Sequence, residues 1–424
     1  MRGWLILLAA CHSNPGVSVD APLDTSIGPT ANAARLVTDT KLAFDVTALT
    51  GTATISFAAS DAPGASLEVG DLAIDAASVM TANDGKGGLT LALPGDATSV
   101  DFAFHYQNHE GLQGASADGY TLTWPYFCGN LFPCHSAPSD GTTFSLSLTG
   151  IPDGKVAIYP TSIPSAAPAY QLAWSMDAYT EIPLGTTTAG TSVSVWYQGG
   201  LAAKATTGSK HLVAAFDWLE QTIGPYRFGN HVGSVSVRWP AGQFGGMEHH
   251  PFWHIAAAAM ADEVTHVHES AHGWFGDGIR IQCWEDFVLS KNTVSYLAGR
   301  ALDVVAPTVG ANAWAGYETE LGQIQPDDLV WPTTCGAVDV IADHLFTDAP
   351  YMRGAFFYRA VALKIGADKL DQALHAFYMA HATGSARMSD MLQTIQDVTG
   401  FDPHPCAELW LHGQTIPAVG ACPT

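Results

Sequence analysis

Two hydrophobic patterns divide the chain near residue 210. From about 35 to 200, short runs of alternating apolar and polar residues, such as 145–148 and 192–197, are separated by Gly, Pro and Asp. Alternation with a period of two is typical of β-strands that bury one face. No helical crossover is visible between the runs, and parallel strands need a long connection, so we expect antiparallel sheets. The pattern predicts an N-terminal β domain, a sandwich or saddle, over 35–205.

The rest of the chain has the periodicity of helices. Apolar residues recur three or four positions apart from Leu212 to Ile223, and Gly224 and Pro225 then end the helix. After one strand-like segment, helical patterns extend over 258–274, 290–305, 353–366, 368–382 and 388–399. A β-rich half followed by an α-rich half indicates separate domains, so we predict a multidomain α+β protein whose mostly helical domain spans 206–424.

The first eleven residues resemble a bacterial secretory signal. Arg2 precedes a short apolar stretch that ends at Cys11, and residues 8–11 (LAAC) resemble the lipobox of lipoproteins, whose cysteine is lipidated. An ordinary signal peptide is the alternative. Residues 12–34 have no apolar period and are typical of a linker. We therefore expect an exported protein, either a lipoprotein held at the cell envelope through Cys11 or a secreted one.

Six further cysteines agree with export, because an even set in an exported chain suggests disulfides. Six cysteines allow 15 pairings. Proximity along the chain favours two short loops, which leaves one long pair, so the predicted pairs are Cys128–Cys134, Cys406–Cys422 and Cys283–Cys335. No C-x-x-C pair is present, so a cysteine-rich zinc site is not expected.

Charge and composition exclude two classes of partner. The 424 residues include 17 Lys and Arg against 40 Asp and Glu, a formal charge of −23. Such a chain lacks the basic face that nucleic acids and anionic membranes require, so we expect no nucleic-acid partner. No apolar run reaches the ~18 residues that span a bilayer. Membrane contact is expected only through a lipid at Cys11.

One motif carries hydrolytic chemistry. Residues 268–272 (HESAH) form an H-E-x-x-H sequence. On a helix, residues four apart lie on one face, so His268 and His272 can meet one metal ion. Glu269 then stands beside the open position of the metal, where a carboxylate can take a proton from bound water.

Segments on both sides of this motif carry a second signal. They are 132–135 (FPCH), 138–144 (PSDGTTF), 224–229 (GPYRFG), 245–249 (GGMEH), 268–277 (HESAHGWFGD), 284–287 (WEDF) and 350–355 (PYMRGA). In this order they resemble the aminopeptidase N family of zinc metallopeptidases, the gluzincins of peptidase family M1. The resemblance extends from about residue 40 to the C-terminus.

The resemblance implies a fold and a set of roles. It implies an N-terminal β domain packed on a thermolysin-like catalytic domain, in a short form without the family's C-terminal helical domain. His268 and His272 would bind one zinc ion, Glu269 would be the general base, and Tyr351 would hold the oxyanion of the tetrahedral intermediate. Asp286 would orient a zinc histidine.

The resemblance also implies a substrate. Glu248, with Gly245, Gly246 and Met247 before it, would anchor the free α-amine of a peptide. Such an anchor implies removal of single N-terminal residues from peptides, by a protein that we expect to be a monomer. The neighbouring histidines at 249, 250, 254 and 266 are expected to line the cleft or to form hydrogen bonds, not to bind zinc.

Two positions depart from the family pattern. The third zinc ligand, a glutamate 19 residues after the second histidine, is replaced by Lys291. Either a neutral Lys291 binds zinc, although neutralising a lysine side chain at pH 7 costs ~4.6 kcal/mol, or a charged Lys291 pairs with Glu269 and takes the place of the metal. A second glutamate that helps to anchor the amine is replaced by Trp124.

These departures leave two hypotheses open. The first is a zinc aminopeptidase, and the second is an impaired homologue that binds peptides without hydrolysing them.

Overall fold

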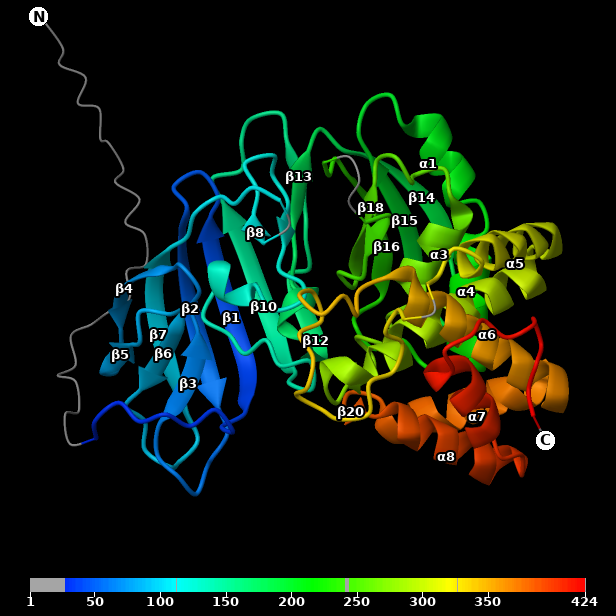
Figure 1. The fold of residues 1–424 in the computed structure, drawn as a ribbon. Coiled ribbons are helices and arrows are strands. Elements are labelled where there is room, and N and C mark those ends of the chain that lie inside the picture. The colour runs from blue at the N-terminus through cyan, green and yellow to red at the C-terminus, as the bar shows by residue number, and fades with distance from the viewer. Residues whose placement is uncertain (1–26, 112, 241–243, 326, 424) are drawn as a thin grey trace, which may run out of the picture.

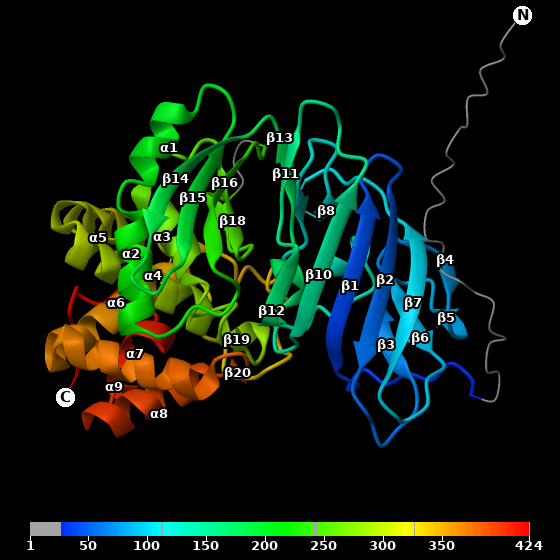
Figure 2. The ribbon, with the colours of Figure 1, turned by 180° about the vertical axis from the view of Figure 1, so that it is seen from behind.

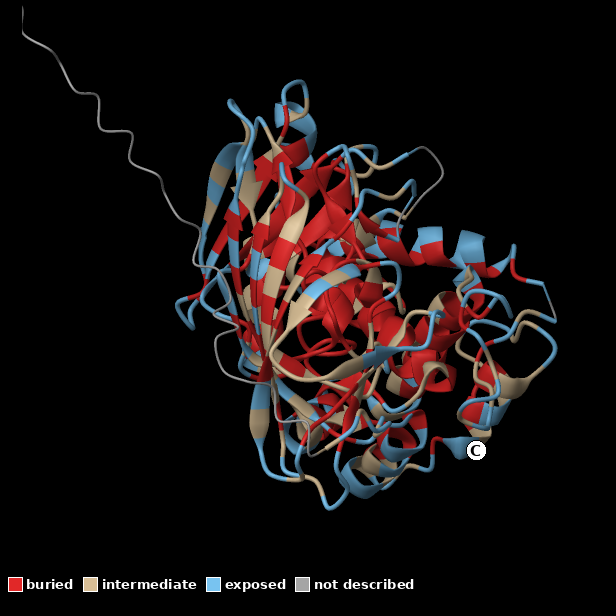
Figure 3. Ribbon diagram, turned by 90° about the vertical axis from the view of Figure 1, so that its left-hand side faces the viewer, coloured by how far each residue is buried: buried red, intermediate tan, exposed pale blue. Residues whose placement is uncertain are grey.

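The computed structural model describes residues 27–111, 113–240, 244–325 and 327–423. Within them a β-rich half lies beside a half that combines a sheet with helices, as the two opposite views show (Figures 1 and 2). Buried residues concentrate on the inner parts of the sheets and helices, and exposed residues lie mainly on loops and outer helix faces (Figure 3). The predicted order of a β domain and a largely helical domain is confirmed.

The N-terminal half is built on a six-stranded sheet. Its strand order is β12-β10-β1-β2-β7-β4, with β1 Val37–Asp45, β2 Thr50–Phe57, β4 Ala73–Ala77, β7 Thr98–His105, β10 Thr142–Thr149 and β12 Ser162–Ala167. Every second residue of β2 is buried, as the alternation predicts. The expectation of purely antiparallel sheets is wrong, because β1 and β10 pair in parallel. Their long connection consists of the strands and loops between them, so no helix is needed for the crossover.

Short strands complete the first half. They are β3 Ala65–Glu68, β5 Thr81–Asn83, β6 Gly88–Leu91, β8 Gly114–Ala115, β9 Thr121–Leu122, β11 Val156–Ile158 and β13 Ser175–Asp177. The end of the predicted linker 12–34 also belongs to this half: Thr30 bridges to Leu91, and the Asn32 side chain donates to Ser60. The predicted signal 1–11, with Cys11, lies outside the described residues.

A second sheet crosses the predicted domain boundary. Its order is β14-β15-β16-β18-β17, with β14 Thr180–Thr186, β15 Ser192–Tyr197, β16 His231–Val237, β17 Gly246–Met247 and β18 Phe252–Ala256. Its strands β14 and β15 lie before the predicted boundary between 205 and 206, and its other strands lie after it. The alternating patterns of β14 and β15 do not show which sheet they join.

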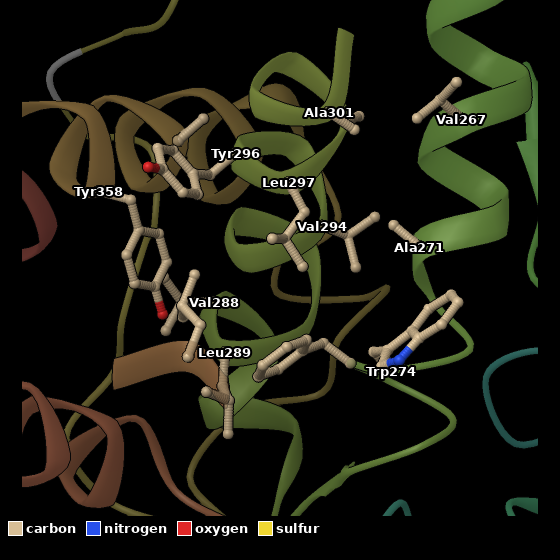
Figure 4. Packing of buried hydrophobic residues seen from close by; sticks show 14 of the residues in the cluster. Val267, Ala271, Trp274, Val288, Leu289, Val294, Tyr296, Leu297, Ala301 and Tyr358 are labelled. Carbon is tan, nitrogen blue, oxygen red and sulfur yellow. The ribbon is translucent and has the colours of Figure 1, made fainter. Parts of the chain in front are cut away.

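Helices pack on this sheet and on one another. They are α1 Ala202–Gly208, α2 Leu212–Thr222, α3 Glu263–Ala271, α4 Phe287–Val305, α5 Pro307–Leu321, α6 Asp348–Ile365, α7 Ala367–His381, α8 Met388–Thr399 and α9 His404–Ala407. α4 is buried along most of its length, and Val294 points toward Ala271 of α3 (Figure 4). Gly354 of α6 lies directly against Asn292 of α4, so any side chain at 354 would displace it. This close packing fixes the helices that carry the site.

Three disulfides join the pairs that proximity predicts, Cys128–Cys134, Cys283–Cys335 and Cys406–Cys422. The second ties the loop between α5 and α6 to the segment just before α4. The Glu285 carboxylate holds the same loop by accepting the backbone N–H groups of Ala337 and Val338, at 2.6 and 2.9 Å. None of the described helices is long and apolar enough to cross a membrane.

Candidate functional site

Helix α3 carries the H-E-x-x-H motif. Asp262 caps its N-terminus, because the carboxylate accepts the backbone N–H of Thr265 at 3.1 Å. The helix brings the rings of His268 and His272 to a centroid distance of 5.1 Å. His272 Nδ1 lies 2.9 Å from the Phe275 carbonyl oxygen, and since a carbonyl only accepts, Nδ1 donates and Nε2 keeps its lone pair. His272 is therefore held in the tautomer whose Nε2 can bind a metal ion or accept a hydrogen bond.

Lys291 of α4 donates a hydrogen bond to that lone pair. Its Nζ donates to His272 Nε2 at 3.2 Å and to Glu248 Oε1 at 2.6 Å. The Lys291 and Glu248 side chains are only 6% and 2% exposed, so this is a buried ion pair. A charged Lys291 thus pairs with Glu248, and the predicted pairing with Glu269 is wrong. Glu248 directly follows β17, and its carboxylate accepts the hydrogen bond from Lys291 of α4.

Glu269 stands beside this pair without a counter-charge of its own. One carboxylate oxygen, Oε2, has no hydrogen-bond partner in the described parts of the chain. Burial, and next the charge of Glu248, raise the pKa of Glu269 well above its ordinary value, while Lys291 acts in the opposite direction. Gly246 of β17 lies so close that a Cβ there would fall 2.5 Å from Glu269 Oε1. The glycine therefore makes room for the glutamate.

These residues lie at a cavity of about 520 Å³. Tyr351, one turn into α6, stacks on the His268 ring at a centroid distance of 5.9 Å. Gly245, Gly246 and Met247 form one edge of the cavity. Aromatic residues from three separate segments, Trp124, Phe244 and Phe346, form an apolar wall. The structure thus gathers the predicted residues His268, Glu269, Tyr351, Glu248 and Lys291 around one cavity.

The donor set does not fit the catalytic zinc ion that the resemblance implies. Such a site needs three protein ligands with lone pairs, and an ammonium has none. Here the ammonium of Lys291 donates to His272 Nε2, the atom that would bind zinc. The ligand atoms that lie within 4.8 Å of one another belong to Glu248, Glu269 and His272, a group without His268. Zinc would have to displace a bonded cation from the same space.

Other predictions around the site have mixed outcomes. Asp286 forms no hydrogen bond to His268 or His272, and it accepts the backbone N–H of Met388 at 3.0 Å. Instead, the carbonyl of Phe275 orients His272. The four extra histidines are buried and hydrogen-bonded, as expected: His249 to His254, His250 to Tyr226 and His266 to Ser234.

Sequence reasoning missed two groups of acids. Asp277 is fully buried near the site, and burial, then the charge of Glu248, raises its pKa well above the ordinary value. Its place in the segment HESAHGWFGD could have indicated it. Three exposed acids, Asp262, Glu320 and Asp348, also line the cavity. Asp348 stands three residues before Tyr351 on the same helix face, and that spacing is a usable signal.

Comparisons with known proteins show similarity in sequence and in fold. Residues 235–410 match the model of the peptidase family M1 domain. The chain is 27% identical over 166 residues to aminopeptidase N of Streptomyces lividans, which is 37% of this chain and 19% of that protein. It is 23% identical over 280 residues to leucine aminopeptidase 2 of Neurospora crassa, 59% of this chain and 40% of the relative. The chain thus spans less than half the length of these two relatives.

A solved structure matches over nearly the whole chain. The M1 zinc metallopeptidase of Deinococcus radiodurans, in a variant bound to Tyr-Ser-Ala, has a TM-score of 0.78 at 18% identity. The match covers 96% of this chain and all of that one. A two-domain M1 zinc metallopeptidase bound to L-tryptophan also gives a TM-score of 0.78. Residues 235–410 thus match the peptidase family M1 domain, and the chain shares the fold of two-domain M1 zinc metallopeptidases.

Proposed function

We propose that this chain binds peptides in an M1-type cleft and that Lys291 blocks hydrolysis. The observation that carries the proposal is the position of Lys291 Nζ, 2.6 Å from Glu248 and 3.2 Å from His272. One side chain thereby engages a residue expected to bind zinc and the residue expected to bind the substrate amine. The Lys291 ammonium therefore obstructs both zinc binding and binding of the substrate amine.

The energetic argument follows from burial. Separating a buried ion pair so that one partner stays unpaired costs about 3–5 kcal/mol. A zinc ion or a substrate ammonium has to supply that free energy before it binds Glu248 or His272 with any net gain. Neutralising the lysine instead costs ~4.6 kcal/mol at pH 7, judged from an ordinary amine in water. Either route lowers zinc affinity by several orders of magnitude.

Peptide binding is supported by the cavity. Its apolar wall of Trp124, Phe244 and Phe346 and its volume of about 520 Å³ suit one or two side chains of a peptide. The structure of similar fold with Tyr-Ser-Ala bound supports the same class of ligand.

A zinc aminopeptidase is the second candidate. It is favoured by the arrangement of His268, Glu269 and Tyr351 around the cavity, and the relatives at 23–27% identity are aminopeptidases. This candidate requires a neutral Lys291 that turns its lone pair toward the metal.

Zinc content and peptide cleavage separate the two candidates. The full chain and its Lys291→Glu variant are each dialysed against zinc, desalted, and assayed for bound metal and for cleavage of aminoacyl reporters. We expect a parent without stoichiometric zinc or turnover, and a variant that binds zinc at least about a hundredfold more tightly, since even loss of a group that supports a ligand costs 10–100-fold. Lys204→Glu, an exposed position on α1, is the matched charge control and should behave like the parent.

Two results would reject the proposal. Stoichiometric zinc and turnover in the parent, abolished by Glu269→Gln, would establish the second candidate. A parent that binds no short peptide in calorimetry would reject peptide binding itself.

A further inference from the structure

We propose that this cleft binds peptide segments whose N-terminal nitrogen is acylated, and that it does not recognise a free α-amine. The proposal rests on the peptide-binding function proposed above and names the class of peptide. An acylated nitrogen occurs both in a blocked peptide and inside a longer chain. The feature that carries the proposal is the ion pair of Lys291 with Glu248, because both residues line the cavity.

Lys291 stands where the ammonium of a ligand would bind. A carboxylate at a peptide-binding cavity is the group that receives an α-ammonium, through a charge-assisted hydrogen bond. Here Glu248 Oε1 already accepts Lys291 Nζ at 2.6 Å, and Glu248 Oε2 lies 3.9 Å from His272 Nε2. The Lys291 and Glu248 side chains are 6% and 2% exposed, so water and salt screen this pair little. An ammonium of the chain itself therefore fills the position.

The other acids of the cavity do not replace Glu248 as an anchor. Burial and the charge of Glu248 raise the pKa of Glu269, while the Lys291 charge lowers it, so this ammonium acts on both carboxylates. A peptide N-terminus drawn toward Glu269 would therefore approach a like charge, which is unfavourable. The remaining acids that line the cavity are exposed, and an exposed ion pair contributes little: Asp262, Glu320 and Asp348.

The apolar wall of the cavity suits an uncharged group. The Phe346 ring packs between Trp124 and Phe244, at centroid distances of 4.7 and 5.0 Å, and Met247 lines the same cavity. Leaving water for such a wall costs an ammonium far more than an amide, unless an opposite charge receives the ammonium. A free α-amine thus loses hydration without gaining a partner, whereas an acylated nitrogen carries no charge to lose.

Calorimetry with matched peptides tests this inference. The tripeptide Phe-Ser-Ala is titrated into the full chain in two forms, with a free α-amine and with an Nα-acetyl group. The titrations are run at about pH 6.5, where an α-amine of pKa about 7.7–8 is protonated. We expect the acetylated form to bind more tightly, or the two dissociation constants to agree within about threefold, the scale of an exposed ion pair. A third peptide, acetylated and extended by two glycines before Phe, separates the two sources: its binding indicates internal segments, and its exclusion indicates blocked N-termini.

Variants of the ion pair test the cause. Lys291→Met frees Glu248, so the free form should gain about tenfold over the acetylated form, the scale of a charge-assisted hydrogen bond. The double variant Lys291→Met with Glu248→Gln removes both charges and should return the ratio of the two constants to the parent value. Lys204→Met makes the same change of charge at an exposed position on α1, outside the cavity, and should leave the ratio unchanged.

Three results would count against the inference. A free form that binds the parent more than about threefold more tightly than the acetylated form overturns it and leaves peptide binding intact. A Lys291→Met variant that is folded by thermal melting and keeps the parent ratio overturns it as well; if this variant does not fold, the ratio in the parent decides alone. If neither form binds the parent, the proposed function itself fails, and this inference with it.

Discussion

Replacing Lys291 by methionine should destabilise the protein more than any exposed substitution. The variant removes the ammonium and leaves the Glu248 carboxylate, 2% exposed, without a counter-charge. At the observed separation of 2.6 Å, the attraction is about 6 kcal/mol for an effective dielectric constant of about 20. Measured losses for breaking such buried pairs are about 3–5 kcal/mol, because the remaining charge regains some solvation. We therefore expect the free energy of unfolding to fall by about 3–5 kcal/mol.

A double-mutant cycle measures the pair itself. Glu248→Gln, Lys291→Met and the double variant are unfolded in urea, and the coupling free energy is taken from the four values. The double variant, which buries no lone charge, should be more stable than Lys291→Met alone. A coupling below about 1 kcal/mol, the value of an exposed pair, would refute the description of a buried ion pair. It would also remove the main support for a blocked site.

Two further predictions concern stability. Asp262→Ala should cost about 0.5–2 kcal/mol in urea unfolding, because it removes the N-cap of α3, while Asp262→Asn should stay near the parent; equal losses in both variants would contradict the capping role. In the β domain, burial opposes the protonation of His135, but its hydrogen bonds to Asp140 at 3.1 Å and to the Ser66 carbonyl at 2.5 Å, with the nearby acidic charges, raise its pKa overall. The folded state then binds this proton more tightly, so its contribution is fully present below about pH 6.5 and is lost as pH rises through the folded pKa. Melting temperature against pH should fall more steeply over that window in the parent than in His135→Gln, and parallel curves would refute the linkage.

Local patterns predicted what depends on local physics. The alternation in β2 and the period of α2 and α8 each bury one face, and those faces are buried in the structure. Helix α5 was missed because its sequence, 307–321, begins with Pro and contains small and polar residues with a weak apolar period. The parallel pairing of β1 with β10 and the place of β14 and β15 in the second sheet depend on contacts between distant segments, which alternation does not encode.

The candidate site shows the same division. The family resemblance put Lys291 at the position of the third zinc ligand, close to His272, and the contact at 3.2 Å confirms their proximity. Lys291 pairs with Glu248 and not with Glu269 because of the way β17 and α4 approach each other at the site. Asp262, Glu320 and Asp348, which also line the cavity, come from three different helices, so their proximity arises only in the folded chain.

The buried ammonium of Lys291 bears on whether this cleft needs a metal ion. Glu248, Glu269 and Asp277 bring three acids into one interior region, where Lys291 is the cation that pairs with Glu248. Here the balancing cation is covalently part of the chain and cannot be lost to a chelator or to a competing protein. The ion pair of Lys291 and Glu248 therefore does not depend on a supply of metal.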